Sequence, residues 1–204
     1  MDSPAPSKRP HCERCLRPLR SCICRWVAPL AHRVEVLVLQ HPLEVANAKG
    51  SARLLHLSLP HSQLLVGEVF AEADLRDAGV KHSLLLYPDT PQHAVLGVPP
   101  APKLDPAVLQ DPAQLRLVVI DGTWRKSRKM LYLNPWLQQL PRLALSGMPA
   151  SHYRIRKAHR PDQLSTLEAT CYALAQLEGE AVNVRPLLDA FDGFVAQQAA
   201  YRPD

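Results

Sequence analysis

The chain has 204 residues, of which 47% are hydrophobic and 21% charged, and it carries a formal net charge of +5. This length accommodates one catalytic domain with a small appendage, and the composition excludes a largely disordered chain. No stretch approaches the roughly 18 apolar residues of a membrane span, and residues 1–10 lack the apolar core of a signal peptide, so we expect a cytoplasmic protein without a membrane partner.

The basic residues fall into three clusters. Of 24 lysines and arginines, six lie in residues 1–25, four in residues 125–129 and four in residues 154–160. Any one cluster could be ordinary solvated surface. Three of them, each beside another informative feature, favour a polyanionic partner such as a nucleic acid.

Four cysteines near the start of the chain indicate a metal site. Their spacing is Cys12-x2-Cys15-x6-Cys22-x-Cys24. In a reducing cytoplasm, closely spaced cysteines are more often metal ligands than disulfides, and four thiolates hold zinc tetrahedrally. His11 could replace one ligand, and an iron–sulfur cluster is the alternative metal centre. We predict a structural zinc ion that folds a basic segment, whose arginines could bind RNA phosphates.

Strands and helices alternate along the rest of the chain. Apolar side chains on both faces predict buried strands over residues 34–40 and 115–120. Shorter strands are predicted over 63–66, 83–87 and 142–145, and helices over 51–59, 123–133, 165–179 and 186–201. Five prolines predict an extended loop over 97–112. The alternation indicates an α/β protein with a mainly parallel sheet and flanking helices.

Three regions follow from this pattern. Residues 1–11 are polar and rich in proline and predict a flexible tail. Residues 12–30 are the cysteine segment with its linker, and residues 31–204 form the catalytic domain.

The helix predicted over residues 165–179 begins with a capping box. In this arrangement the Ser165 hydroxyl and the Glu168 carboxylate each satisfy a free amide of the first turn. Cys171 shares one helix face with Leu167 and Leu174, so we expect a buried apolar residue and not a nucleophile.

Asp121 ends the second buried strand, just before a helix, where ligands gather in parallel α/β sheets. A carboxylate here could accept a proton from a substrate, and Gly122 lets another molecule approach the backbone closely. Asp121 or Thr123 could equally be the cap of the helix. Trp124 is either a core anchor or an aromatic that stacks on a base.

The helix that follows Asp121 has a basic face. Arg125, Arg128 and Lys129 are spaced so that they share this face, and a basic stripe beside an acid suits an RNA substrate.

The segment Asp121, Gly122, Thr123, Trp124 resembles the Asp-x-Thr-Trp signature of the DTW-domain family, the tRNA-uridine aminocarboxypropyltransferases. The resemblance spans about residues 11–200 and includes the four-cysteine start. It also takes in His41, Pro42 and Glu44, the segment 86–88, Tyr153 to Lys157, and Asp162 to Glu168. This combination is far more specific than the tetrapeptide alone, which a scan would find by chance.

The resemblance implies a reaction and a fold. The reaction is transfer of the 3-amino-3-carboxypropyl (acp) group of S-adenosylmethionine to N3 of a tRNA uridine, which gives acp3U, in bacterial relatives at a variable-loop position. The fold would be similar to that of the SPOUT methyltransferases, with a C-terminal knot. Two alternatives stay open, namely an S-adenosylmethionine-dependent RNA methyltransferase and a noncatalytic zinc-bearing RNA-binding protein.

The chemistry of this reaction, the positions of the loops and the basic clusters suggest roles for particular residues. Asp121 would be the base that deprotonates N3, with Thr123 and Trp124 beside it. Loops at the strand ends would hold the cofactor, by position at His41, Leu86, Tyr87, Pro88, Leu145, Ser165 and Thr166. The tRNA phosphates would contact Arg125, Arg128, Lys129, Arg154, Arg156 and Lys157.

Overall fold

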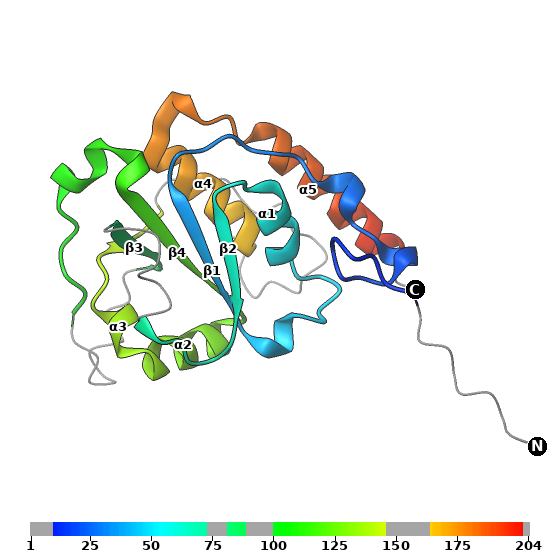
Figure 1. Cartoon of the computed structure of the whole chain (residues 1–204), viewed down its shortest axis with the longest axis horizontal. Coiled ribbons are helices and arrows are strands. Elements are labelled where there is room, and N and C mark those ends of the chain that lie inside the picture. Colours follow the sequence, from blue (N-terminus) through cyan, green and yellow to red (C-terminus); the bar gives the residue numbers. More distant parts are fainter. Residues whose placement is uncertain (1–9, 73–80, 89–99, 146–163, 202–204) are drawn as a thin grey trace, which may run out of the picture.

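The computed structural model describes residues 10–72, 81–88, 100–145 and 164–201 of the chain. A central sheet is surrounded by helices, and the cysteine-containing N-terminal segment lies against the last helix (Figure 1). Across these four ranges, no helix combines the length and the apolar composition that crossing a bilayer requires.

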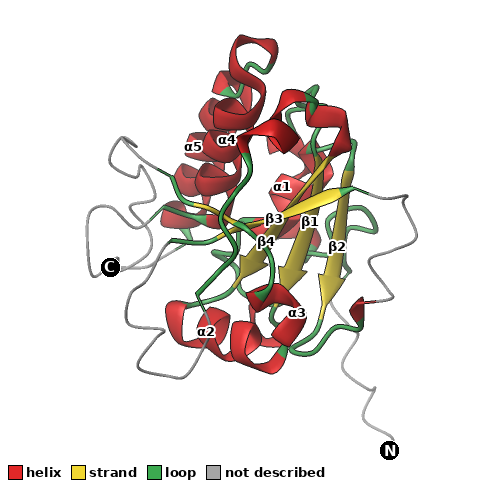
Figure 2. Cartoon of the chain, turned by 90° about the vertical axis from the view of Figure 1, so that its left-hand side faces the viewer, coloured by secondary structure: helices red, strands yellow, loops and turns green. Residues whose placement is uncertain are grey.

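Five parallel strands form the sheet, in the order β2-β1-β4-β3-β5. They are β1 (Glu35–Gln40), β2 (Ser62–Val66), β3 (His82–Leu86), β4 (Leu115–Asp121) and β5 (Arg142–Leu143). The arrowheads of β1, β2 and β4 lie at the same end of the sheet, next to α2 and α3 (Figure 2). The prediction of a mainly parallel α/β sheet is therefore confirmed.

The direction in which strands are added reverses between β1 and β4. Strand β2 lies on the outer side of β1, whereas β3 and β5 lie beyond β4. In open parallel sheets ligands bind at such a point, outside the carboxyl ends of the strands. The fold thus places the end of β4, at Asp121, where a site is expected.

Helices cover both faces of the sheet. They are α1 (Ala52–Ser58), α2 (Trp124–Leu133), α3 (Pro135–Gln138), α4 (Thr166–Glu178) and α5 (Arg185–Ala200). Val36 and Val38 of β1 belong to the core that α1, α4 and α5 share, whereas Leu37 and Leu39 belong to the core with α2 and α3. This division follows from the alternation of side chains along a strand, and it explains why β1 is apolar on both faces.

The predicted helices and strands agree with the observed ones to within a few residues, with three differences. The last strand ends at Leu143 rather than at residue 145. The loop predicted over residues 97–112 contains a 3-10 helix, Pro106–Gln110, because the Asp105 side chain accepts a hydrogen bond from the Ala107 amide and caps it. Residues 135–138, for which no helix was predicted, form α3, which begins at Pro135 because proline suits the first turn of a helix.

Two predictions fall outside the described residues. The C-terminal knot depends on the path of residues 146–163, so it stays a prediction. The flexible tail, apart from its last two residues, also lies outside the described part of the chain.

The linker after the cysteines packs directly onto α5. The Trp26 indole donates a hydrogen bond to the Gln197 side chain, which in turn donates to the Cys22 carbonyl at 3.2 Å. The Trp26 ring lies so close to Gly193 that a Cβ atom there would come within 2.1 Å of a ring carbon. Glycine at position 193 is therefore required by the approach of Trp26.

Replacing Gly193 with alanine tests this packing. Alanine favours helix by about 1 kcal/mol over glycine, but forcing a methyl group against a packed ring costs about 1–3 kcal/mol. We expect Gly193→Ala to lower the free energy of unfolding, measured by urea denaturation. In a Trp26→Ala background the same change should be neutral or stabilising, and an equal loss in both backgrounds would contradict the assigned contact.

Candidate functional site

The buried Asp121 carboxylate joins three elements that are far apart in sequence. Asp121 is paired in register with Gln40, the last residue of β1, and Gln40 Nε2 donates a hydrogen bond to Asp121 Oδ2 at 2.9 Å. Thr166, the first residue of α4, donates from Oγ1 to Asp121 Oδ1 at 2.6 Å. Asp121 is only 6% exposed. Its two oxygen atoms are thus held in a fixed orientation at the carboxyl edge of the sheet.

Thr123, not Asp121, occupies the N-cap position of α2. Its backbone is extended, and its side chain accepts a hydrogen bond from the Lys126 amide at 3.4 Å. Of the two cap candidates in the sequence, Thr123 therefore has this structural role. The Asp121 carboxylate faces Gln40 and Thr166 instead.

A small hollow with a volume of about 50 Å³ opens beside Asp121, and we call it the Asp121 hollow. This volume is well below that of a pocket for a whole ligand, so the hollow suits one small polar end of a ligand. One wall is formed by Asp121, Gly122 and Thr166, and the other by the segment after β1. The second wall consists of Glu44, Asn47, Lys49, Gly50 and Ser51. The hollow is therefore lined by side chains of both charges.

The Glu44 carboxylate ties this second wall to α2. Glu44 is buried and accepts hydrogen bonds from Lys126 Nζ at 2.7 Å and from Asn47 Nδ2 at 2.8 Å. A buried carboxylate is tolerated when its oxygens are paired in this way. The ion pair holds the start of α2 and the loop after β1 against each other.

His41 lies directly after β1, beside Gly122. Its backbone amide donates to the Asp121 carbonyl at 3.0 Å, and its Nδ1 accepts from the Leu43 amide at 3.1 Å. The proton then resides on Nε2, which is 2.7 Å from Glu68 Oε1. Hydrogen bonding to Lys129, at 2.6 Å, is the main cause that lowers the pKa of Glu68, and His41 adds to it. His41 is thus connected, through Glu68, to Lys129 of α2.

An aromatic pair lies at the end of β3. The rings of Tyr87 and Trp124 meet edge to face, with centroids 5.7 Å apart. Tyr87 is buried, and this burial raises its pKa. Trp124 is 49% exposed, so it is not the core anchor that was one of its two predicted roles. The Arg142 guanidinium lies 5.4 Å from the Tyr87 ring centroid and also donates to the Pro88 carbonyl at 3.3 Å.

The structure gathers only some of the residues predicted to hold a cofactor. Thr166 is the one that lines the Asp121 hollow. Tyr87 and Pro88 lie at the end of β3, and Leu86 and Leu145 are half-buried and pack against the core beside α4. Four residues of this wall were missed, namely Asn47, Lys49, Gly50 and Ser51. Glu44 was part of the family resemblance, and its position just after a buried strand is a signal that could have pointed to this loop.

The start of α4 confirms the predicted capping box. The Glu168 amide donates to Ser165 Oγ at 3.1 Å, and the Ser165 amide donates to Glu168 Oε2 at 2.7 Å. Cys171 is fully buried, which raises its pKa to about 12, so it is the apolar core residue that was expected.

Three of the predicted phosphate contacts are exposed on α2, namely Arg125, Arg128 and Lys129. Lys129 is paired with Glu68, which leaves the two arginines as the more accessible charges. The other three, Arg154, Arg156 and Lys157, lie outside the described residues.

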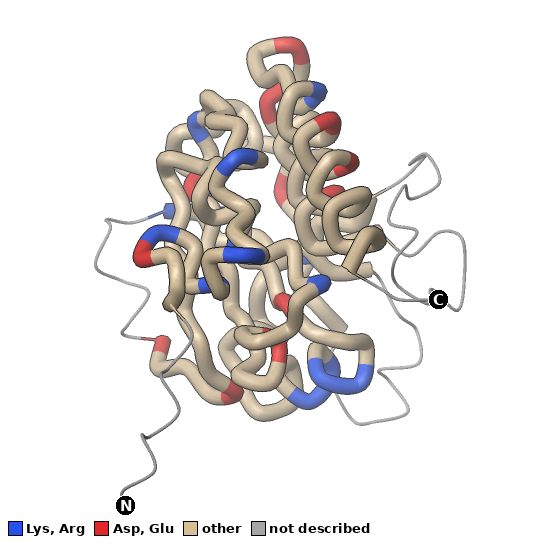
Figure 3. The backbone as a smooth tube through the Cα atoms, turned by 90° about the vertical axis from the view of Figure 1, so that its right-hand side faces the viewer, with Lys and Arg blue, Asp and Glu red and all other residues tan. Residues whose placement is uncertain are grey.

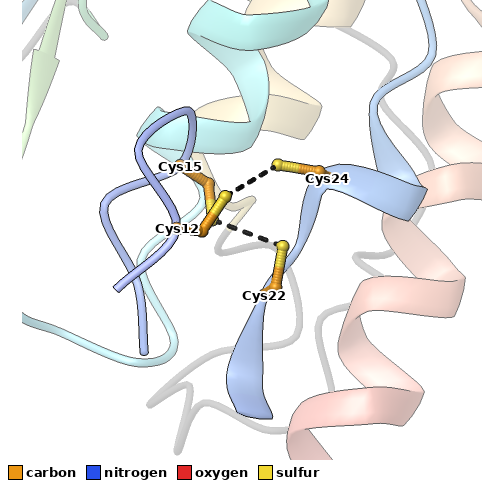
Figure 4. Close-up of side chains that lie close together, drawn as sticks. All are labelled: Cys12, Cys15, Cys22 and Cys24. Atoms are coloured by element: carbon orange, nitrogen blue, oxygen red, sulfur yellow. Dashed lines mark hydrogen bonds between the residues drawn. The ribbon is translucent and has the colours of Figure 1, made fainter. Parts of the chain in front are cut away.

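The four N-terminal cysteines converge (Figure 4). Cys12 and Cys15 come from one turn, and Cys22 and Cys24 come from the neighbouring segment of the chain. All four sulfur atoms lie within 4.8 Å of one another, with Cys12 3.6 Å from Cys24 and Cys15 3.8 Å from Cys22.

This arrangement fits a zinc ion. Zinc–sulfur bonds of about 2.3 Å in a tetrahedron separate the sulfurs by about 3.8 Å, which matches the two measured distances. An iron–sulfur cluster places several metal atoms between its cysteines and requires more widely spaced sulfurs. Backbone amides of Cys15 and Arg14 lower the pKa of Cys12 to about 6, so one ligand is already favoured as a thiolate. The exposed His11 lies outside the group.

Metal analysis tests the cysteine site. We expect about one zinc ion per chain in the purified protein by mass spectrometry of its metal content. The zinc content of Cys15→Ser should fall well below one ion per chain, because this substitution removes a buried ligand. Cys171→Ala removes a thiol from α4 and should keep its zinc. Full zinc content in Cys15→Ser would contradict the assignment.

Comparison with known proteins places these features in context. A family model described as the DTW domain matches residues 9–199. The chain is 31% identical over 183 residues to tRNA-uridine aminocarboxypropyltransferase 2 of Mus musculus, an alignment that covers 84% of this chain and 57% of the mouse protein. It is 32% identical over 195 residues to the Drosophila melanogaster protein of the same name, covering 89% of this chain and 74% of the fly protein.

A plant relative is more distant. The tRNA-uridine aminocarboxypropyltransferase A of Arabidopsis thaliana is 24% identical over 134 residues, which are 61% of this chain and 51% of the plant protein. The chain thus spans little more than half the length of the mouse and plant relatives. A comparison with solved structures found none that matches.

Proposed function

The chain belongs to the DTW-domain family, and from this premise we propose that it transfers the acp group of S-adenosylmethionine to N3 of a tRNA uridine. The names of its mouse and fly relatives support this reaction class. The structural observation that carries the proposal is the buried, oriented Asp121 carboxylate beside a polar hollow at the carboxyl edge of the sheet. We further propose that the uridine lies in the variable loop and that the reaction is cytoplasmic.

The Asp121 hollow supports binding of the amino-acid end of S-adenosylmethionine. That end carries an ammonium and a carboxylate, and the residues that line the hollow include the acids Glu44 and Asp121 and the base Lys49. Both charges of the ligand would therefore find a partner of opposite sign. The loops after β1, β3 and β5, with His41, Leu86 to Pro88 and Leu145, are left for the adenosyl part.

Asp121 is the candidate base. In S-adenosylmethionine the γ-carbon of the acp group, next to the sulfonium sulfur, is the electrophile. Attack by N3 forms the N3–carbon bond and breaks the carbon–sulfur bond, so 5′-methylthioadenosine leaves and the N3 proton passes to the base. N3 of uridine carries a proton at neutral pH and becomes a good nucleophile only when it is lost, so a carboxylate within hydrogen-bond reach is apt. Gln40 and Thr166 hold the Asp121 oxygens in place, and Thr123 stabilises the turn that follows by capping α2.

Trp124 is suited to contact the uridine. N3 is accessible only when the base is unpaired or unstacked, so the enzyme must offer a surface for the displaced base. Trp124 lies three residues after Asp121 in the chain and is half-exposed. Its ring packs edge to face against the buried Tyr87 ring. An aromatic ring in such a position provides a stacking surface for any base.

The distribution of charge supports tRNA binding at the α2 side. Residues 164–201, which form α4 and α5, contain five acids and one base, and acidic residues predominate on these helices (Figure 3). Helix α2 contains four bases and no acid. A polyanion would be repelled by the first surface and attracted by the second, where Arg125 and Arg128 are exposed.

The direct test is incubation of the zinc-loaded protein with unmodified tRNA and S-adenosylmethionine, followed by mass analysis of the nucleosides. We expect a uridine derivative heavier by the acp group. A methyl increase would replace the proposal with a methyltransferase, and no change with any tRNA would leave an RNA-binding protein.

Substituting Asp121 tests its role as the base. General-base catalysis contributes about 10²–10⁴-fold, so Asp121→Asn should lower the rate of acp transfer at least about 100-fold. Affinity for tRNA, measured by filter binding, should be nearly unchanged because Asp121 is buried.

Asp189→Asn is the matched control, since it makes the same chemical change at an exposed site on α5. It should transfer at the wild-type rate. An active Asp121→Asn enzyme would refute the base assignment.

A further inference from the structure

We propose that the cysteine segment, Cys12 to Cys24, positions one wall of the Asp121 hollow, and that Arg17 is the residue through which it does so. We call residues 47–50 the wall loop, since three of them line the hollow. The inference rests on the proposed function in one respect, namely that the hollow binds S-adenosylmethionine. It assigns to the zinc-bearing segment a role in cofactor affinity in addition to RNA binding.

The Arg17 guanidinium bridges the segment and the wall loop. Its Nη1 donates to the Ala48 carbonyl at 2.6 Å and its Nη2 donates to the Gly50 carbonyl at 2.9 Å. The planar guanidinium presents two N–H groups in a fixed fork that matches two carbonyls at once, whereas a lysine ammonium has no such fixed geometry. Its carbon also lies 5.3 Å from the centroid of the buried Phe194 ring of α5. The group is therefore aimed by contacts on two sides.

The metal-binding turn holds the backbone of Arg17. The Cys12 amide donates to the Arg17 carbonyl at 2.8 Å, and the Leu16 amide donates to the Cys12 carbonyl at 2.7 Å. Leu16 has a φ of 61°, the left-handed conformation that closes this turn. Because Cys12 and Cys15 are candidate ligands, a bound zinc ion would fix the same turn from which Arg17 extends.

The wall loop makes several local hydrogen bonds. The Asn47 amide donates to the Glu44 carbonyl at 3.1 Å, the Gly50 amide to the Asn47 carbonyl at 2.8 Å, and the Lys49 amide to Asn47 Oδ1 at 3.0 Å. These bonds shape a turn, and Glu44, paired with Lys126, holds the Asn47 end of the loop against α2. The Arg17 contacts come from the cysteine segment and hold the other end, at Ala48 and Gly50.

The wall loop is connected to the Asp121 carboxylate through Ser51 and the start of α4. Ser51 follows the loop, lines the hollow and accepts a hydrogen bond from the Leu167 amide at 3.3 Å. Leu167 adjoins Thr166, which donates to Asp121. A second contact joins the segment to α1, because Arg53 donates to the Arg14 carbonyl at 3.3 Å. The contacts therefore run from the cysteine turn through the wall loop to the start of α4.

Zinc-loaded Arg17→Ala tests the proposal, with Arg20→Ala as the matched control. Arg20 belongs to the same segment and carries the same charge, and among the described residues its one hydrogen bond is accepted by its backbone carbonyl from the Tyr201 hydroxyl. Hydrogen exchange should show faster exchange of amides 47–53 in Arg17→Ala than in wild type, and no difference in Arg20→Ala. Equal exchange in wild type and Arg17→Ala would overturn the proposal.

Affinity for S-adenosylhomocysteine, measured by calorimetry without RNA, gives the second readout. We expect about 10-fold weaker binding for Arg17→Ala, as follows when the binding arrangement of the loop falls to about one tenth of the population. In turnover, KM for S-adenosylmethionine should rise while kcat stays within about twofold, because a saturating ligand restores the loop. A loss in kcat with unchanged KM would contradict a positioning role.

Hydrogen exchange and ligand affinity distinguish a failure of this proposal from a failure of the proposed function. If wild-type protein binds no S-adenosylhomocysteine, the proposed function fails, yet the exchange of amides 47–53 still decides whether Arg17 places the wall loop. If Arg17→Ala does not fold or loses zinc, Arg17→Lys replaces it, because lysine keeps the charge and loses the fork. Wild-type exchange and affinity in Arg17→Lys would then overturn the proposal.

Discussion

The arrangement of the site depends on the hydrogen bonds that Gln40 and Thr166 donate to the Asp121 carboxylate. A buried carboxylate is stable only when its oxygens are hydrogen-bonded, and here the donors come from β1 and from the start of α4. Satisfying Asp121 thus holds the register of β1 against β4 and the position of α4 over the sheet edge. The hollow forms where these three elements meet the loop after β1.

Much of the fold could be predicted from the sequence because its signals are local. The two central strands are apolar on both faces, the capping box lies within four residues, and the cysteine spacing is compact. The contact of Thr166 with Asp121 could not be predicted, since it joins residues 45 positions apart. For the same reason the sequence left Asp121 and Thr123 as equal caps, and the wall formed by residues 47–51 was missed. Those residues carry no strong pattern of their own and line a site only through tertiary packing.

The cysteine segment packs against the α/β body of the protein in this structure. Trp26 packs on Gly193 of α5, Gln197 reaches the Cys22 carbonyl, and Arg17 reaches the loop that lines the hollow. A small segment with few apolar residues gains stability from a metal ion and from such docking together. Arg17 of the basic N-terminus makes contacts within the protein. The other N-terminal arginines and the exposed arginines of α2 would then bind the phosphates.

If the acp group is transferred at the Asp121 hollow, a crystal structure with S-adenosylhomocysteine will show the ligand there. We expect the amino-acid end of the ligand to lie within hydrogen-bond reach of the residues that line the hollow, with the sulfur on the Asp121 side. A ligand bound at another surface, with Asp121 remote from its sulfur, would show that the transfer takes place elsewhere.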